Sequence, residues 1–205
     1  MALGYGRVGT NNFACSKFIV DTNGLNTGAT HSTITSAMSD ASSGDTIFVR
    51  PGTYTENFTL KAGICLTAMP TCKTTGITKI VGKIAYTGTG QSSISNFSFV
   101  SNEKLETNGD YALETSGTNS GSLFIHDCFI RAEDNIAINQ SNANSSIQCF
   151  QSITSQASTF AISTVSGGAL SFDDCSSSNS GGTVAASTVS AGNLQFNYCT
   201  INYPL

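Results

Sequence analysis

Apolar residues in the second half of the chain recur with a nearly fixed period. Four segments that alternate apolar and polar residues begin at positions 123, 147, 170 and 194, at steps of 24, 23 and 24 residues. They read LFIHDC, IQCFQS, LSFDDC and LQFNYC. A second short apolar run precedes each of them, at 112–113, 136–138, 160–162 and 184–186, with Ser, Gly, Asn and Thr between the runs. Two or three short strands joined by turns and repeated at this period are typical of one coil of a solenoid.

Stacking the four segments predicts which side chains point inward. The first and third positions form the columns Leu123/Ile147/Leu170/Leu194 and Ile125/Cys149/Phe172/Phe196, and after a turn the sixth position adds Cys128/Ser152/Cys175/Cys199. Columns of similar residues suit parallel strands about 4.8 Å apart. The leucine-rich repeat has a similar period, but its Leu-x-x-Leu-x-Leu pattern is missing. The sequence therefore predicts an all-β, single-stranded, right-handed parallel β-helix with coils of 23–24 residues.

A short amphipathic helix is expected at residues 32–43, ahead of the first coil. Ile34, Ala37, Met38 and Ala41 fall on one helical face, Ser32 or Thr33 can serve as N-cap, and Gly44 can end the helix. Such a helix would cover an end of the β-helix that could otherwise recruit another strand. We expect an N-terminal arm at 1–17 and a single β-helix domain at 18–205.

After this helix, residues 44–54 read GDTIFVRPGTY, which predicts a strand, a Pro-Gly turn and the start of another strand. The stretch resembles the opening of the pectin-lyase-like right-handed β-helix superfamily, and Phe18–Asp21 with Asn23-Gly24 resembles the strand and loop before it. The resemblance covers residues 18–205 and implies the fold. It does not fix an activity, because lyases, esterases, epimerases, glycosidases, phage tail proteins and adhesins share this opening. The low-charge coils more closely resemble uncharacterised phage and metagenomic tail-fibre or tailspike-like virion proteins.

Charge narrows the function classes. The net charge of −4 arises from 9 basic and 13 acidic residues. Arg131 is the last basic residue, and Glu133, Asp134, Asp173 and Asp174 follow it. A nucleic-acid surface needs a basic stripe, which the C-terminal half lacks. No apolar stretch approaches the length of a membrane span or of a secretory signal.

The seven cysteines stand at 15, 65, 72, 128, 149, 175 and 199, with no CxxC pair and only His31 and His126 beside them. This spacing disfavours zinc. A disulfide between stacked Cys175 and Cys199 is possible, but parallel Cβ atoms about 4.8 Å apart exceed the usual ~3.5–4.5 Å. We expect buried free thiols in the cysteine column, and a Cys65–Cys72 bond stays open.

Carboxylates at the turns are the candidate catalytic groups. Asp127, Asp173 and Asp174 lie at one turn, with Arg131, Glu133 and Asp134 at the next. Asp127 and Asp174 share a repeat position two coils apart, roughly 9–10 Å, near the upper limit for the two carboxylates of an inverting glycosidase. The competing interpretation is that Asp at a turn serves the backbone. We favour that interpretation and predict no catalytic, cofactor-binding or metal-binding residues.

Other polar residues give weaker signals. His126 and His31 are expected at the surface, and Arg50 with Glu56 on neighbouring strands is a possible surface ion pair. The sequons at Asn57, Asn96, Asn139 and Asn144 are expected by chance in so Ser/Thr/Asn-rich a chain.

The predicted function is a structural fibre or spike protein of a virion, made in the host cytoplasm, or of an extracellular assembly. Its rod would serve assembly and attachment to a host glycan. A self-assembling filament subunit and a polysaccharide lyase or glycoside hydrolase are the alternatives. With no capping helix after 200–205, and with Pro204 to blunt the edge, we expect a homo-oligomer, either a trimer or a head-to-tail stack joined by the 1–17 arm, with other virion proteins as partners.

Overall fold

A computed structural model provides the structure of the protein. It describes residues 18–24, 28–69, 78–87, 89–100, 112–132, 138–156, 163–179 and 187–202. The predicted N-terminal arm at 1–17 lies outside these ranges.

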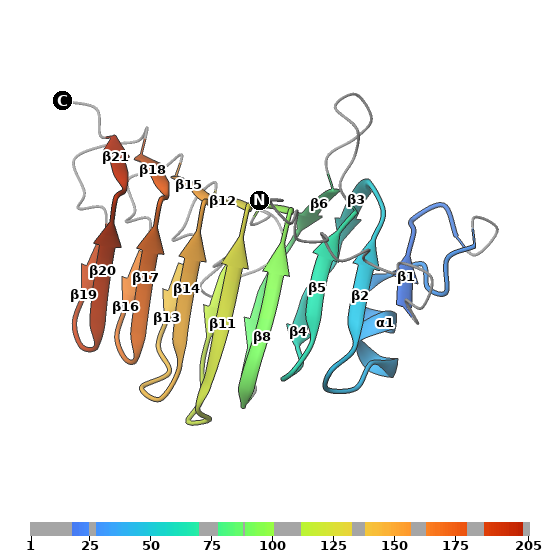
Figure 1. Ribbon diagram of the computed structural model, residues 1–205, viewed down its shortest axis with the longest axis horizontal. Coiled ribbons are helices and arrows are strands. Elements are labelled where there is room, and N and C mark those ends of the chain that lie inside the picture. The colour runs from blue at the N-terminus through green and yellow to red at the C-terminus, as the bar shows by residue number, and fades with distance from the viewer. Residues whose placement is uncertain are drawn as a thin grey trace, which may run out of the picture.

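Parallel strands form three sheets that run along a rod (Figure 1). Sheet A, with eight strands among the described residues, contains β1 (Phe18–Val20), β2 (Thr46–Val49), β5 (Cys65–Ala68), β8 (Gly90–Ser95), β11 (Gly121–His126), β14 (Ser146–Phe150), β17 (Ala169–Asp173) and β20 (Asn193–Asn197). Sheet B contains β3 (Gly52–Thr55), β6 (Thr78–Val81), β9 (Ser98–Val100), β12 (Phe129–Ala132), β15 (Ile153–Gln156), β18 (Ser176–Asn179) and β21 (Thr200–Asn202). Sheet C contains β4 (Phe58–Leu60), β7 (Ile84–Tyr86), β10 (Leu113–Thr115), β13 (Ile138–Gln140), β16 (Ser163–Val165) and β19 (Ser187–Val189).

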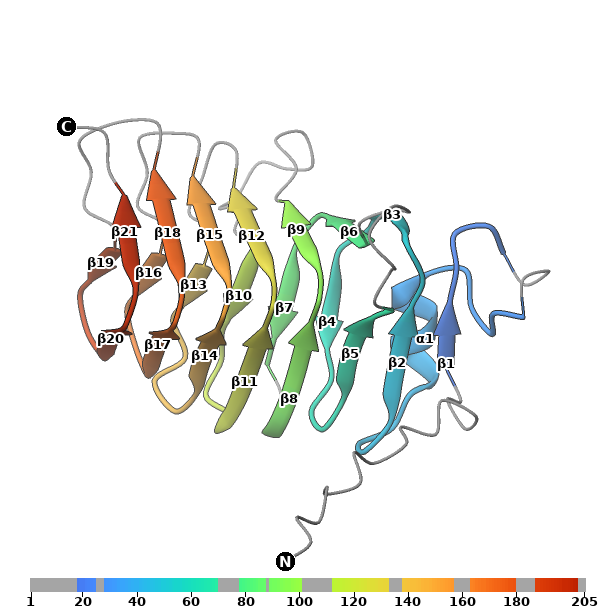
Figure 2. The same cartoon turned by 45° about the horizontal axis from the view of Figure 1, so that its top comes forward.

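The chain visits one strand of each sheet per coil, so that every strand pairs in parallel with the strands one coil away (Figure 2). The predicted right-handed parallel β-helix is confirmed, and each coil has three strands. Register also follows the prediction: Leu123 pairs with Ile147, Ile147 with Leu170, and Leu170 with Leu194. The repeat of 23–24 residues is therefore the length of one coil from Leu123 to Leu194. In the N-terminal half the predicted length is wrong, because paired residues of sheet A lie 19 (Ile47 and Leu66), 28 (Leu66 and Ile94) and 31 (Ser92 and Leu123) positions apart.

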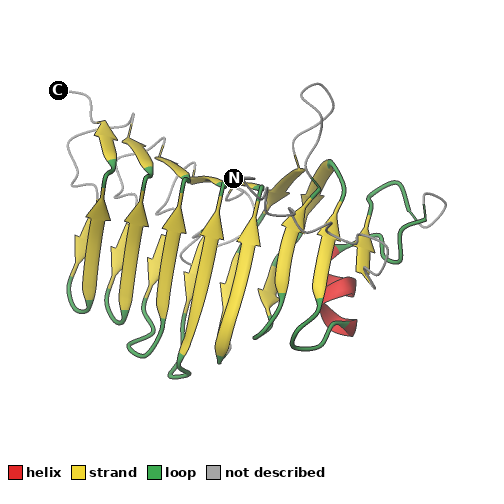
Figure 3. Ribbon diagram, in the orientation of Figure 1, coloured by secondary structure: helices red, strands yellow, loops and turns green. Residues whose placement is uncertain are grey.

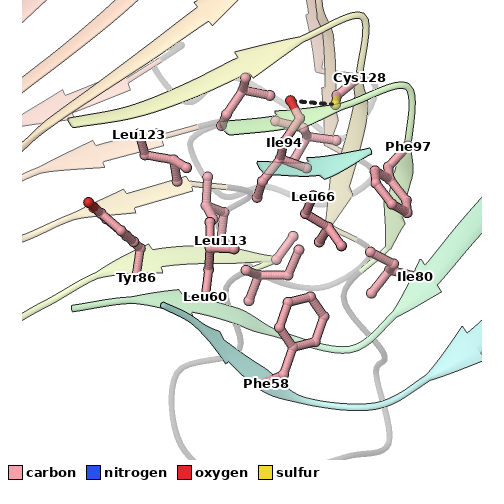
Figure 4. Packing of buried hydrophobic residues seen from close by; sticks show 14 of the residues in the cluster. Phe58, Leu60, Leu66, Ile80, Tyr86, Ile94, Phe97, Leu113, Leu123 and Cys128 are labelled. Carbon is pink, nitrogen blue, oxygen red and sulfur yellow. Dashed lines mark hydrogen bonds between the residues drawn. The ribbon is translucent and has the colours of Figure 1, made fainter. Parts of the chain in front are cut away.

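One apolar core runs through the rod. At most 1% of the surface is exposed for the column residues Leu123, Ile125, Leu170 and Phe172. Figure 4 shows side chains from all three sheets pointing toward one another in the N-terminal half. Fully burying an aliphatic or aromatic side chain is worth about 1.5–3 kcal/mol. The repeated inward columns therefore hold the coils together.

A single short helix, α1 (Ile34–Asp40), covers the core beside β1, β2 and β4 in the described part of the chain (Figure 3). Ile34, Ala37 and Met38 are buried as predicted, and the side chain of Thr33 accepts a hydrogen bond from the Ser36 amide as N-cap. Within the described residues, no helix is long and apolar enough to span a membrane.

The expected end of the helix at residue 43 is wrong. The helix ends at Asp40, because Ala41 takes an extended conformation (φ −73°, ψ 147°) that keeps its side chain buried. Gly44 lies beyond the helix in a turn at φ 95°.

In sheet C, the described part of β16 begins at Ser163 and that of β19 at Ser187, and both serines stack in line with Ile138. The apolar runs at 160–162 and 184–186 lie outside the described residues.

Candidate functional site

The corner between sheets A and B is built on one left-handed residue in each of five successive coils. These residues are Asn96 (φ 66°), Asp127 (φ 52°), Gln151 (φ 47°), Asp174 (φ 52°) and Tyr198 (φ 55°). Non-glycine residues rarely adopt this conformation, and Asn and Asp are enriched in it. Two of the candidate catalytic carboxylates, Asp127 and Asp174, thus occupy positions that suit Asp for backbone reasons.

The left-handed residue also keeps the hydrogen-bond ladder intact around the corner. The Asp127 amide donates to the Phe150 carbonyl at 3.2 Å, and the Asp174 amide donates to the Asn197 carbonyl at 3.0 Å. The sharp turn directs the following residue inward, as predicted for Cys128, which is 3% exposed. A turn of one residue therefore accounts for the break in the inward–outward alternation at the sixth repeat position.

A hollow of about 480 Å³ lies at this corner and contains Asp127, one of the candidate catalytic carboxylates. Its lining consists of Asn96, Phe97, Ser98, Asp127, Cys128, Phe129 and Gln151. Asp127 is the single carboxylate in this lining. Burial raises the pKa of the Cys128 thiol to about 12, so that this thiol is protonated at neutral pH. One carboxylate beside a neutral thiol provides no acid–base pair.

Within the described ranges, the other predicted acidic residues do not complete a pair. In the stack, Gln151 lies between Asp127 and Asp174, and Asp173 accepts a hydrogen bond from the Asn197 side-chain amide at 2.7 Å. Arg131 lies in β12, while Glu133 and Asp134 fall outside the described ranges. His126 stacks on Phe150 with ring centroids 4.9 Å apart, which gives this half-buried outward histidine a packing role.

A second hollow, an open groove of about 780 Å³, follows the opposite corner, between sheets C and A. It extends along the rod and crosses successive coils. Its lining consists of Gly90, Gln91, Ser120, Gly121, Ser122, Ala143, Asn144, Ser145, Ser146, Ser166, Gly167, Gly168, Ala169, Ala191 and Gly192. None of these residues is ionisable. In the sequence these stretches are only the Ser-, Gly-, Asn- and Thr-rich segments between apolar runs, and the Gly and Ser residues before each strand of sheet A were the signal available.

A buried amide holds the floor of this groove. Gln140 is 0% exposed, and its Nε2 donates to the Ser145 carbonyl at 2.7 Å, while its Oε1 accepts from Thr115. The Asn142 side-chain amide donates to the Asn119 carbonyl at 2.7 Å and ties one turn to the next. These polar groups are satisfied within the protein, as buried polar groups must be.

Close packing explains the glycine at position 168 of the groove. A Cβ atom on Gly168, at φ 62°, would lie 2.2 Å from the Ser145 carbonyl oxygen and 2.3 Å from that of Asn142. Backbone from neighbouring coils thus leaves no room for a side chain there.

Among the residues that the structure describes, ion pairs lie at the N-terminal end and in the middle of the rod. Arg50 pairs with Asp21 at 3.1 Å, and Glu56 accepts hydrogen bonds from the first amides of α1, so that the predicted pairing of Arg50 with Glu56 is replaced by two separate contacts. His31 is held against Asp40 at 3.1 Å and is largely covered, not a free surface residue. Among the described residues, no group of three or more His, Cys, Asp or Glu side chains is placed to hold a metal ion.

The cysteine column consists of free thiols, as predicted. Cys128 and Cys175 are buried, and Cys199 is partly exposed at the last coil. Cys149, in the column of Ile125 and Phe172, is also a buried free thiol. Desolvation raises the pKa of all three buried thiols, which makes them poor nucleophiles. Cys65 is exposed, and Cys72, its possible partner, lies outside the described residues.

Comparisons with known proteins support the fold alone. No protein family model matches the chain, and no curated protein is similar to it in sequence. Among solved structures, Escherichia coli YbhC is similar with a TM-score of 0.63 at 12% identity, over 95% of this chain and 68% of that one. The pectin methylesterase of Aspergillus niger is similar with a TM-score of 0.59 at 14% identity, over 93% of this chain and 81% of that one. A mutant pectin methylesterase in complex with a hexasaccharide is similar with a TM-score of 0.55 at 13% identity, over 89% of this chain and 66% of that one.

These structures define the fold class of the chain. The chain has the pectin-lyase-like right-handed β-helix fold, as the resemblance at residues 44–54 implied. Identities of 12–14% carry no activity over to it. The comparisons gave no likeness to phage tail fibres.

Proposed function

We propose that the protein is a structural rod, a fibre or spike component of a virion or extracellular assembly, that attaches to a neutral glycan without chemical turnover. The observation that carries the proposal is the composition of the two hollows at the corners of sheet A. The larger has no ionisable residue in its lining, and the smaller has a single carboxylate. Binding of an uncharged sugar needs hydrogen-bonding groups, whereas hydrolysis needs a pair of acid–base groups.

The core is consistent with a rod made in a reducing compartment. Three thiols stay free in the interior although they lie in neighbouring coils. Disulfides are characteristic of proteins that fold in oxidising compartments. Virion proteins fold in the host cytoplasm and reach the exterior only when the cell lyses, which would combine an extracellular architecture with free core thiols.

A binding assay paired with a turnover assay tests this proposal. We expect the purified protein to bind neutral oligosaccharides on a glycan array while releasing neither reducing ends nor methanol from the bound polysaccharides. Asn144→Asp and Ser122→Asp would place negative charges in the groove and weaken binding, with Asp174→Asn, at the other corner, as a control that leaves binding unchanged. Retained binding in both groove variants would contradict this location, and turnover abolished by Asp127→Asn would contradict the non-catalytic function.

An enzyme acting on a polysaccharide is the second candidate. It is favoured by the fold that the chain shares with two pectin methylesterases and by the position of Asp127 in a hollow on the outer surface. The test is methanol release from methyl-esterified pectin and reducing-end release from neutral and acidic polysaccharides. Activity lost in Asp127→Asn and kept in Asp173→Asn would support this candidate. Absence of release from every substrate would reject these two reaction types.

A further inference from the structure

At the N-terminal end of the rod, the chain itself covers the outer edge of sheet A. The Ile19 carbonyl in β1 accepts hydrogen bonds from the amides of Thr30 at 2.8 Å and His31 at 3.1 Å. The Asp21 amide donates to the His31 carbonyl at 3.0 Å, and the Ile19 amide donates to Thr30 Oγ1 at 2.9 Å. The backbone groups on the outer side of β1 are thus engaged, and this edge cannot accept a further strand.

The C-terminal end has no such cover in the described part of the chain. Sheets A, B and C end at β20, β21 and β19. Val189 is 47% exposed, whereas Val165, one coil earlier in the same column, is 0% exposed. Phe196 stacks one ring face on Phe172 at 5.0 Å and is only partly buried. An open strand edge and an apolar layer therefore lie together at this end.

The absence of charged side chains limits which partners can cover the C-terminal end. No Asp, Glu, Lys, Arg or His follows Asp174 in the sequence. Edge strands usually carry charges that prevent pairing with another chain, and β20 (Asn193–Asn197) has none. Two copies of this surface meet without like-charge repulsion, whereas an acidic or basic partner finds no complementary charge.

We propose that a second copy of the chain covers this end, so that two rods join tail to tail. The two β20 strands would pair in antiparallel fashion about a twofold axis at Gln195, continuing sheet A across the junction. In that pairing, Leu194 of one copy lies opposite the partner's Phe196, and both side chains face the core. Because the edge of β1 is occupied, this arrangement closes as a dimer and does not propagate into a head-to-tail filament. The inference is independent of whether the rod binds a glycan.

The experiment is a mass measurement of the 205-residue protein by light scattering across a concentration series. We expect twice the 21.3 kDa of one chain at micromolar concentration. Gln195→Lys would place two positive charges against each other at the twofold axis and raise the dimer dissociation constant by about tenfold or more. The matched control is Gln148→Lys, which adds the same charge in the same outward column two coils away and leaves the mass unchanged.

Disulfide cross-linking checks the position of the proposed twofold axis. In a Gln195→Cys variant the new thiols of two copies meet at the axis, and mild oxidation should give a dimer that peptide mapping assigns to a 195–195 bond. Gln148→Cys should give no 148–148 bond. A protein that stays monomeric, forms trimers or filaments, or dimerises equally well as Gln195→Lys would overturn the proposal. Cover by a different partner corresponds to the monomeric outcome.

Discussion

The two ends of this rod carry the same architecture but finish it differently. At the N-terminal end, α1 lies over the core. The Glu56 carboxylate accepts hydrogen bonds from the amides of Ile34 at 2.9 Å and Thr35 at 2.7 Å. Lys61 donates a hydrogen bond to the Ser39 carbonyl at 2.7 Å. At the C-terminal end, the described chain finishes on strands whose apolar side chains remain partly exposed.

This difference shows that an apolar side chain of the repeat is fully buried only where its coil has another coil on each side. A valine of the same column is fully buried at residue 165 and half exposed at 189. In a solenoid each coil contacts only the coils next to it, so that the terminal layers need a special solution. The first coil is covered by side chains specific to the N-terminal end, and the last coil would be covered by a second copy of the chain.

Thiol labelling should show the largest difference between the inner coils and the last coil. At pH 8, Cys128 and Cys175 should react at least about 10³-fold more slowly than Cys199, because the buried thiols have raised pKa values and are exposed only when the coils open. Peptide mass spectrometry reports each cysteine separately, and exposed Cys65 is the internal standard. If two copies join at the C-terminal end, Cys199 labelling should slow as protein concentration increases. Equal rates for Cys128 and Cys199 would contradict the comparison.

The pH dependence of stability follows from the same raised pKa values. Because folding raises the Cys128 pKa from 9.0 to about 12, the thiol stabilises the native state fully below pH 9, and this contribution is lost between pH 9 and about pH 12. Chemical denaturation at pH 8 and pH 10.5 measures the fall. In Cys128→Ala the decrease over this range should be smaller, and an unchanged decrease would contradict the assignment.

Truncating an apolar side chain should cost more at the covered end. Ile34→Ala removes a fully buried side chain on the inner face of α1 and should lower the free energy of unfolding by about 2–4 kcal/mol. Val189→Ala, on a half-exposed residue of the last coil, should lower it by about 0.5 kcal/mol in the monomer. Urea denaturation at submicromolar concentration measures both. Equal losses would mean that the C-terminal layer is as well covered as the N-terminal one.

The contact between Glu56 and the helix should have an intermediate effect. Glu56→Ala leaves two amides at the start of α1 without their acceptor and should cost about 1 kcal/mol. Glu114→Ala is the matched control, since it removes a carboxylate that pairs with partly exposed Lys83 and should cost less. Thermal unfolding followed by circular dichroism compares the two variants. A larger loss in Glu114→Ala would reject the capping role.

The smallest effect concerns the corner residue between sheets A and B. Gln151→Asn places a residue better suited to the left-handed conformation at φ 47°, and should raise stability by about 0.5 kcal/mol. Asn96, already of the preferred type at φ 66°, gives the reverse test, since Asn96→Gln should lower stability by a similar amount. Opposite signs in the two variants would confirm that this column is selected for its backbone conformation. Equal signs would contradict it.

The sequence by itself determined the repeat, and through it most of the fold. Alternating residues such as Leu170 and Phe172, recurring every 23–24 positions, specify both the inward columns and the register, because shifting a strand by one residue would turn its apolar face outward. The helix at Ile34–Asp40 was likewise predictable from the spacing of its buried residues and its N-cap.

Only the tertiary structure decided the contacts between coils. The pairing of Glu56 with α1 and the hydrogen bonds of Gln140 join residues from different coils or turns, whose positions depend on loop lengths that no local pattern encodes. The carboxylates at the corners appeared as catalytic candidates because their residue type fits chemistry as well as turns. At Asp127 and Asp174 a left-handed backbone supports the turn interpretation, and the stacking of the coils puts Gln151 between the two carboxylates.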